Sequence, residues 1–127
     1  MVEMVLIAPL LLMLVFAIAE FGVMFGRWQN LSNAAREGAR NAVTFRANCI
    51  QANVETEVRD VVKSYASSLG MTVANGDITV TGACGGPNTN SVVNVTHTHT
   101  FSVLPNFAQS MSSAINLVGS STMRNEG

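Results

Sequence analysis

Charged residues are scarce in this chain, and their shortage is concentrated in one segment. They make up only 12% of the 127 residues, about half of the share usual in soluble domains. The stretch from Met4 to Ala19 contains none. The net charge is −1 and no basic cluster occurs, so the positive surface that nucleic-acid binding requires is missing. A single tryptophan and a single tyrosine leave no set of aromatic side chains for stacking bases.

Signatures of enzymes and cofactor sites are also missing. The sequence has no GxSxG or SxxK motif, and its Gly-rich stretch 82–86 lacks the lysine of a phosphate-binding loop. CxxC spacing is absent, and the two histidines, His97 and His99, have no evident third metal ligand nearby. They fall on one face of a predicted strand beside apolar residues, which favours packing or subunit contact. We therefore expect no catalytic residue, cofactor or metal.

The apolar N-terminal segment allows three interpretations. A cleavable signal peptide needs a basic start and a small-residue cleavage site, and neither is found here. A transmembrane anchor fits the length, because the 23 residues from Met4 to Gly26 span a bilayer as a helix. Glu20 lies inside that span, however, and an ionised carboxylate in hydrocarbon costs several kcal/mol unless it is paired or near the interface. The third interpretation is a helix that leaves the lipid and packs against copies of itself.

Small and helix-breaking residues mark particular points of this helix. Pro9 removes one backbone donor, so we expect the helix to kink or loosen around residues 5 to 9. Gly22 and Gly26 are four residues apart and permit close contact with another helix. The alternative for the two glycines is that they are merely tolerated at the membrane exit.

Two acidic residues bracket the apolar run. Glu3 can pair with an α-amino group, its own or a neighbour's, and such a pair would help to set subunit register in a water-poor core. Alternatively, Glu3 lies among the lipid headgroups of the membrane and has no role in assembly. Glu20 would face Arg27 of a neighbouring helix or reach interfacial water.

The remaining sequence predicts an α+β head carried by a long helix. Domain 1–46 would be one helix, with an apolar half 1–26 for membrane or filament core and an amphipathic half 27–46. The head, 47–127, would contain an amphipathic helix 51–69 and antiparallel strands at 78–81, 92–103 and 115–124, with a helical turn at 107–113. Cys49 and Cys84 are expected to form a disulfide. It would close a loop of about 36 residues, worth roughly 3–4 kcal/mol.

Both ends of the chain resemble TadE-like pilins. The resemblance rests on a VEF-type start, an LPLLL-like run, an EFG, an Ala-Arg-x-Gly-Ala-Arg segment and a Met-Arg-x-Glu ending. In this sequence these appear as Val2-Glu3-Met4, Ala8-Pro9-Leu10-Leu11-Leu12, Glu20-Phe21-Gly22, Ala35-Arg36-Glu37-Gly38-Ala39-Arg40 and Met123-Arg124-Asn125-Glu126.

The resemblance implies a type IV pilin-like fold and a subunit of the tight-adherence (Tad/Flp) class. Such a subunit is inserted in the bacterial inner membrane, cut by a prepilin peptidase and assembled with other pilins by an ATPase-driven platform. It ends as a homo-oligomeric helical filament on the cell surface, of the kind that serves adhesion. The alternatives are a minor pilin or pseudopilin that primes or tips the filament, and a membrane-anchored surface binding domain. Type IV pilins usually carry their glutamate at the fifth mature position, whereas Glu3 is third here, so we expect different processing or further residues before Met1.

Overall fold

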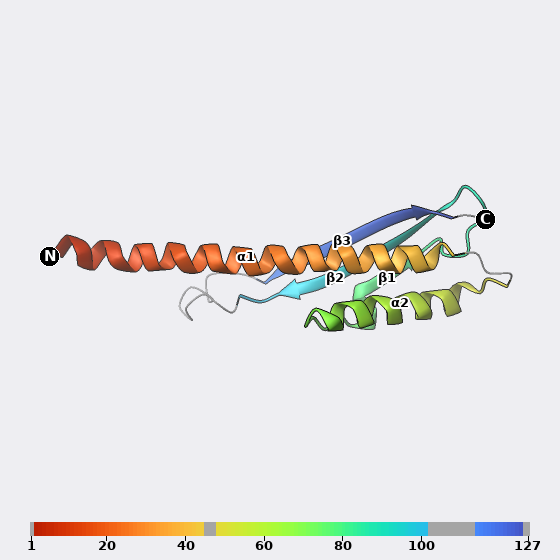
Figure 1. Cartoon of the computed structure of the whole chain (residues 1–127), viewed down its shortest axis with the longest axis horizontal. Helices are drawn as coiled ribbons and strands as arrows, with labels where there is room; N and C mark the ends of the chain where they lie inside the picture. The colour runs from red at the N-terminus through yellow and green to blue at the C-terminus, as the bar shows by residue number, and fades with distance from the viewer. Residues whose placement is uncertain (1, 45–47, 102–113, 126–127) are drawn as a thin grey trace.

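A computed structural model describes residues 2–44, 48–101 and 114–125, and side chains from Met4 onward. These described residues form two helices and three strands, in the order α1 (Val2–Ala42), α2 (Gln51–Ser68), β1 (Ile78–Thr81), β2 (Asn90–His99) and β3 (Ile115–Arg124), with a 3₁₀ turn at Asn75–Asp77 before β1. Figure 1 shows α1 as the long axis of the molecule, with the other elements gathered along its C-terminal half. This is the α+β, pilin-like architecture that the sequence predicts.

The two halves of α1 differ in what covers them. Its 41 residues correspond to a length of about 60 Å. From Leu31 onward, one face is buried against the head by small or apolar residues at helical spacing: Leu31, Ala34, Ala35, Ala39 and Ala42. The helix is unbroken at Pro9, so the expected loosening does not interrupt it. It ends at Ala42 rather than near residue 46.

Helix α2 runs back alongside α1 (Figure 1) and completes the core. It buries a regular stripe formed by Val54, Val58, Val62 and Ala66, as expected for an amphipathic helix. Gly70 follows the helix with φ = +73°, a left-handed conformation that glycine adopts at little cost. The predicted helix 51–69 is thus confirmed to within one residue.

The strands form one antiparallel sheet in the order β1-β2-β3. Ile78 of β1 pairs with Val95, and Val95 pairs with Gly119 of β3. In β2 the side chains of Val93, Val95 and His99 are buried, which confirms the predicted alternation. The strand was predicted to run to residue 103, whereas β2 ends at His99, opposite Ile115 where β3 begins. Thr100 and Phe101 belong to no strand. Residues 102–113, with the expected helical turn, lie outside the described residues.

Two glycines allow the layers to approach closely. A Cβ on Gly38 of α1 would lie 2.6 Å from Cγ2 of Val62, and a Cβ on Gly119 of β3 would lie 2.6 Å from the backbone carbonyl of Leu31. The second contact is with backbone, which cannot rotate away. Glycine is therefore required where β3 crosses α1.

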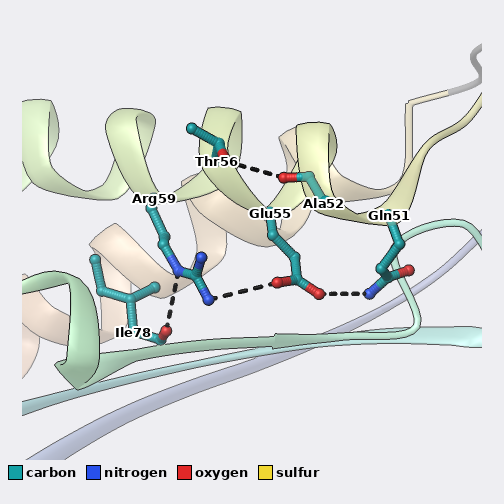
Figure 2. A network of polar contacts seen from close by, with 6 residues as sticks. All are labelled: Gln51, Ala52, Glu55, Thr56, Arg59 and Ile78. Carbon is teal, nitrogen blue, oxygen red and sulfur yellow. Dashed lines mark hydrogen bonds and ion pairs between the residues drawn. The ribbon is translucent and has the colours of Figure 1, made fainter.

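A polar network fastens the first turns of α2 to the edge of the sheet (Figure 2). Arg59 donates from Nε to the carbonyl of Ile78 at 3.5 Å, and from Nη2 to Glu55 at 3.4 Å. Gln51 donates to the other oxygen of Glu55 at 3.0 Å. The backbone amide of Cys84 donates to Gln51 Oε1 at 3.3 Å. The network thus links α2 to both β1 and the loop that follows it.

The tip of the head is closed by a disulfide and a buried asparagine. Cys49 and Cys84 form the predicted disulfide, with their Cα atoms 5.7 Å apart. Asn125, just after β3, donates from Nδ2 to the carbonyl of Gly82 at 2.9 Å and to Thr89 Oγ1 at 2.7 Å. Its Oδ1 accepts from the buried Ser91 hydroxyl at 2.6 Å. The loop between β1 and β2 is therefore held from two sides.

Candidate functional site

The N-terminal half of α1 is a bare apolar surface. Met4, Leu6 and Leu10 are each more than 70% exposed, and no other helix or strand that the structure describes runs alongside the first turns of α1 (Figure 1). By length and composition, this helix can cross a membrane. A surface of this size is apolar on all sides, and it requires lipid or other protein around it.

Glu20 is the first described carboxylate along this surface, and the structure buries it. It is 2% exposed, and its Oε1 lies 3.0 Å from Nε2 of His99 at the end of β2. The other ring nitrogen, Nδ1, lies 3.0 Å from Nη1 of Arg27. The imidazole therefore bridges two charged residues of α1 that are two turns apart.

The two hydrogen bonds determine which ring nitrogen of His99 carries the proton. A guanidinium can only donate, so Nδ1 of His99 must accept from Arg27. Nε2 then carries the single ring proton and donates it to Glu20. A neutral imidazole in this tautomer accepts a hydrogen bond from the positive Arg27 and donates one to the negative Glu20. The buried carboxylate is thereby satisfied within its own chain.

The sequence indicated Glu20 and Arg27 but missed their partner. Glu20 was expected to face Arg27 of a neighbouring helix or to reach interfacial water. The structure instead joins the two residues through His99, which is 79 residues from Glu20 in the chain. The available signal was the position of His99 on the apolar face of β2. A histidine at such a position needs a polar partner when it is buried.

An aromatic strip flanks this network. Phe21 and Phe25 stack with ring centroids 6.4 Å apart, and Phe25 and Trp28 lie 5.7 Å apart. All three side chains are at least 44% exposed. Trp28 Nε1 donates to the carbonyl of Val118 in β3 at 3.2 Å. The strip thus begins on the bare helix and ends on the head.

The remaining predicted residues lie along the bare part of α1. A Cβ on Gly22 or Gly26 would have no atom within 4 Å, so both positions are open to a neighbouring helix. Pro9 is exposed, and Glu3 belongs to the first turn of α1. In the part of the chain that is described, no group of three or more His, Cys, Asp or Glu side chains is placed to hold a metal ion.

The long apolar helix, second helix and small antiparallel sheet define a pilin-like protein. Residues 1–40 match the family model described as TadE-like protein, which supports the resemblance seen in the N-terminal motifs. The C-terminal motif at residues 123–126 lies outside the matched range. The family is associated with the Tad pilus and is non-enzymatic. Neither the curated proteins nor the solved structures contained a significant match to the chain.

Proposed function

We propose that this chain is a structural subunit of a Tad-type, type IV pilus-like surface filament and that it polymerises through α1. The observation that carries this proposal is the bare apolar half of the helix. Eleven large hydrophobic side chains between Met4 and Ile18 are at least 41% exposed. Fully burying one such side chain is worth about 1.5–3 kcal/mol, which sets an upper limit of roughly 17–33 kcal/mol for the eleven. That exceeds the stability of a typical domain.

Lipid and then neighbouring subunits can bury these hydrophobic side chains in succession. In the inner membrane the apolar half of α1 would be surrounded by lipid, and in the filament it would be surrounded by the same segment of other subunits. Glu20 is compatible with both, because His99 satisfies it inside the chain. The partners of this route are the prepilin peptidase, the membrane assembly platform and other pilins.

Glu3 has a separate role in this proposal. It would pair with an α-amino group in the filament core and fix the axial position of one subunit against the next. Pro9, Gly22 and Gly26 would shape the contact between neighbouring helices. These assignments rest on the sequence pattern and on the open space around the two glycines.

Two alternatives differ in abundance and location. A minor pilin would be present in few copies per filament, where it primes or tips the polymer. A membrane-anchored binding domain would stay in the inner membrane or envelope and never enter a filament. The exposed helix fits all three roles, but the open glycine positions favour those in which helices pack together.

The decisive experiment is electron microscopy of sheared surface filaments, combined with mass spectrometry of their main protein band. We expect this chain to be the main component. Its presence in trace amounts would indicate the minor pilin, and its retention in the inner membrane would refute the filament role.

A substitution tests the register role of Glu3. We expect Glu3→Ala to abolish filaments while the protein still reaches the membrane. Asp77→Ala, at an exposed carboxylate of the head, is the matched control and should assemble normally. Normal assembly of Glu3→Ala would remove Glu3 from the mechanism.

A further inference from the structure

The face of α1 opposite the head carries two exposed arginines, Arg36 and Arg40, that have no partner among the described residues. Successive helical residues are rotated by about 100°, which places Gly22, Gln29, Asn33, Arg36 and Arg40 on one line of the helix. All five are exposed. Because the head covers the opposite side of α1, this line continues the bare surface of the N-terminal half toward the tip.

Arg36 and Arg40 project from neighbouring turns of this line. They are four residues apart, so they lie about 6 Å apart along the axis. Neither makes a hydrogen bond or ion pair with the residues that the structure describes. Where another subunit covers this face, two adjacent cations require compensation by negative charge, because an unpaired charge is costly once water is excluded.

Suitable negative charge lies in a groove between α1 and α2. The groove has a volume of about 480 Å³ and is lined by Glu37 of α1 and by Glu57, Asp60, Val61, Ser64, Tyr65 and Ser68 of α2. Its lining is mainly apolar, with three carboxylates around it. Such a groove can receive the aliphatic stem of an arginine while the carboxylates bind its guanidinium.

The spacing of the two surfaces is compatible. Glu57 and Asp60 are three residues apart on α2, or about 4.5 Å along the axis, close to the separation of the two arginines. The Glu57 carboxylate also accepts from Asn41 at 3.4 Å, which holds it at the groove. Glu37 and Asp60 make no ion pair or hydrogen bond with described residues.

We propose that Arg36 and Arg40 of one subunit dock into the Glu37, Glu57 and Asp60 groove of a second copy of this chain. This inference rests on the proposed filament function and names a lateral contact between its heads. In a helical filament the arginines of each subunit would contact the groove of the next subunit, and a contact repeated in this head-to-tail way is heterologous. A heterologous contact propagates into an open helical polymer when the rotation between subunits does not close a ring.

Charge reversal provides the test in cells that assemble the filament. Arg36→Glu with Arg40→Glu makes both surfaces acidic, and Glu37→Arg with Asp60→Arg makes the groove basic. We expect each double variant to reduce the sheared filament yield at least tenfold. Mixing the two variants by co-expression should restore the yield to within about threefold of the wild type, with both chains in the same filaments.

Controls separate the lateral contact from folding, net charge and the filament role itself. Emission from the single tryptophan, Trp28, should remain as in the wild type for both double variants in detergent. Lys63→Glu with Arg124→Glu changes the net charge as much as the arginine variant, lies outside the groove lining and should assemble normally. Wild-type yield from either double variant, no rescue in the mixture, or equal loss in this control would overturn the contact alone. Absence of the wild-type chain from filaments would overturn the filament function and the contact together.

Discussion

The bridge from Glu20 through His99 to Arg27 leads to a quantitative prediction about how firmly the head is attached to α1. Replacing His99 by phenylalanine keeps an aromatic ring of similar size but removes both hydrogen bonds. Each involves a charged partner, and such bonds contribute about 1.5–3 kcal/mol. The His99 side chain is fully buried and Glu20 is 2% exposed, so water cannot replace the lost donor without opening the contact.

We therefore expect His99→Phe to destabilise the head by about 3 kcal/mol or more. For a domain of this size, that corresponds to a fall in Tm of roughly 10 °C. Trp28 is a suitable reporter, because its indole donates to Val118 of β3 and its emission should change when the sheet leaves α1. The assay is denaturant and thermal unfolding of the full chain in detergent, followed by tryptophan fluorescence.

The neighbouring histidine provides the matched control. His97 lies on the same face of β2, is only half-buried and makes no hydrogen bond with described residues. We expect His97→Phe to change stability by less than about 1 kcal/mol. If His99→Phe were no more destabilising than His97→Phe, the assignment of a stabilising bridge would be wrong. A double-mutant cycle with Glu20→Gln should then also show no coupling.

Three further substitutions probe the other contacts of the head. Gly119→Ala places a methyl group against the Leu31 backbone, so it should cost at least 2 kcal/mol and alter Trp28 emission before any denaturant is added. Asn125→Ala removes side-chain hydrogen bonds to the loop before β2 and should cost about 2–3 kcal/mol, measured by urea unfolding. Serine at both Cys49 and Cys84 should cost about 3–4 kcal/mol. Equal stability of the wild type with and without reductant would contradict that last value.

The local elements of this fold could be read from the sequence because each has its own periodicity. The stripe of Val54, Val58 and Val62 predicts α2, and alternation predicts the strand that contains Val93. The disulfide was predictable from an even number of cysteines. These signals depend only on neighbouring residues and on the export-type N-terminus.

The contacts that join the head to α1 could not be predicted in the same way. His99 meets Glu20 only because β2 lies along α1, and no local pattern states which strand does so. The same holds for Gly119, whose role depends on the crossing of β3 over Leu31. The sequence predicted that Glu20 would face Arg27 of a neighbouring helix or reach interfacial water, because no local pattern indicates a partner 79 residues away.

The alanine-lined face of α1 has a mechanical consequence. Ala34, Ala35, Ala39 and Ala42 are fully buried and have no rotamers to lose or exchange. The helix and the head are thus joined by short, stiff contacts rather than by long side chains that can slide. A force pulling along the apolar half of α1 is transmitted to the whole head as shear along the helix. The head moves little relative to the helix while it bears this force. The disulfide between Cys49 and Cys84 at the tip of the head limits how far the start of α2 and the loop after β1 can separate under that force.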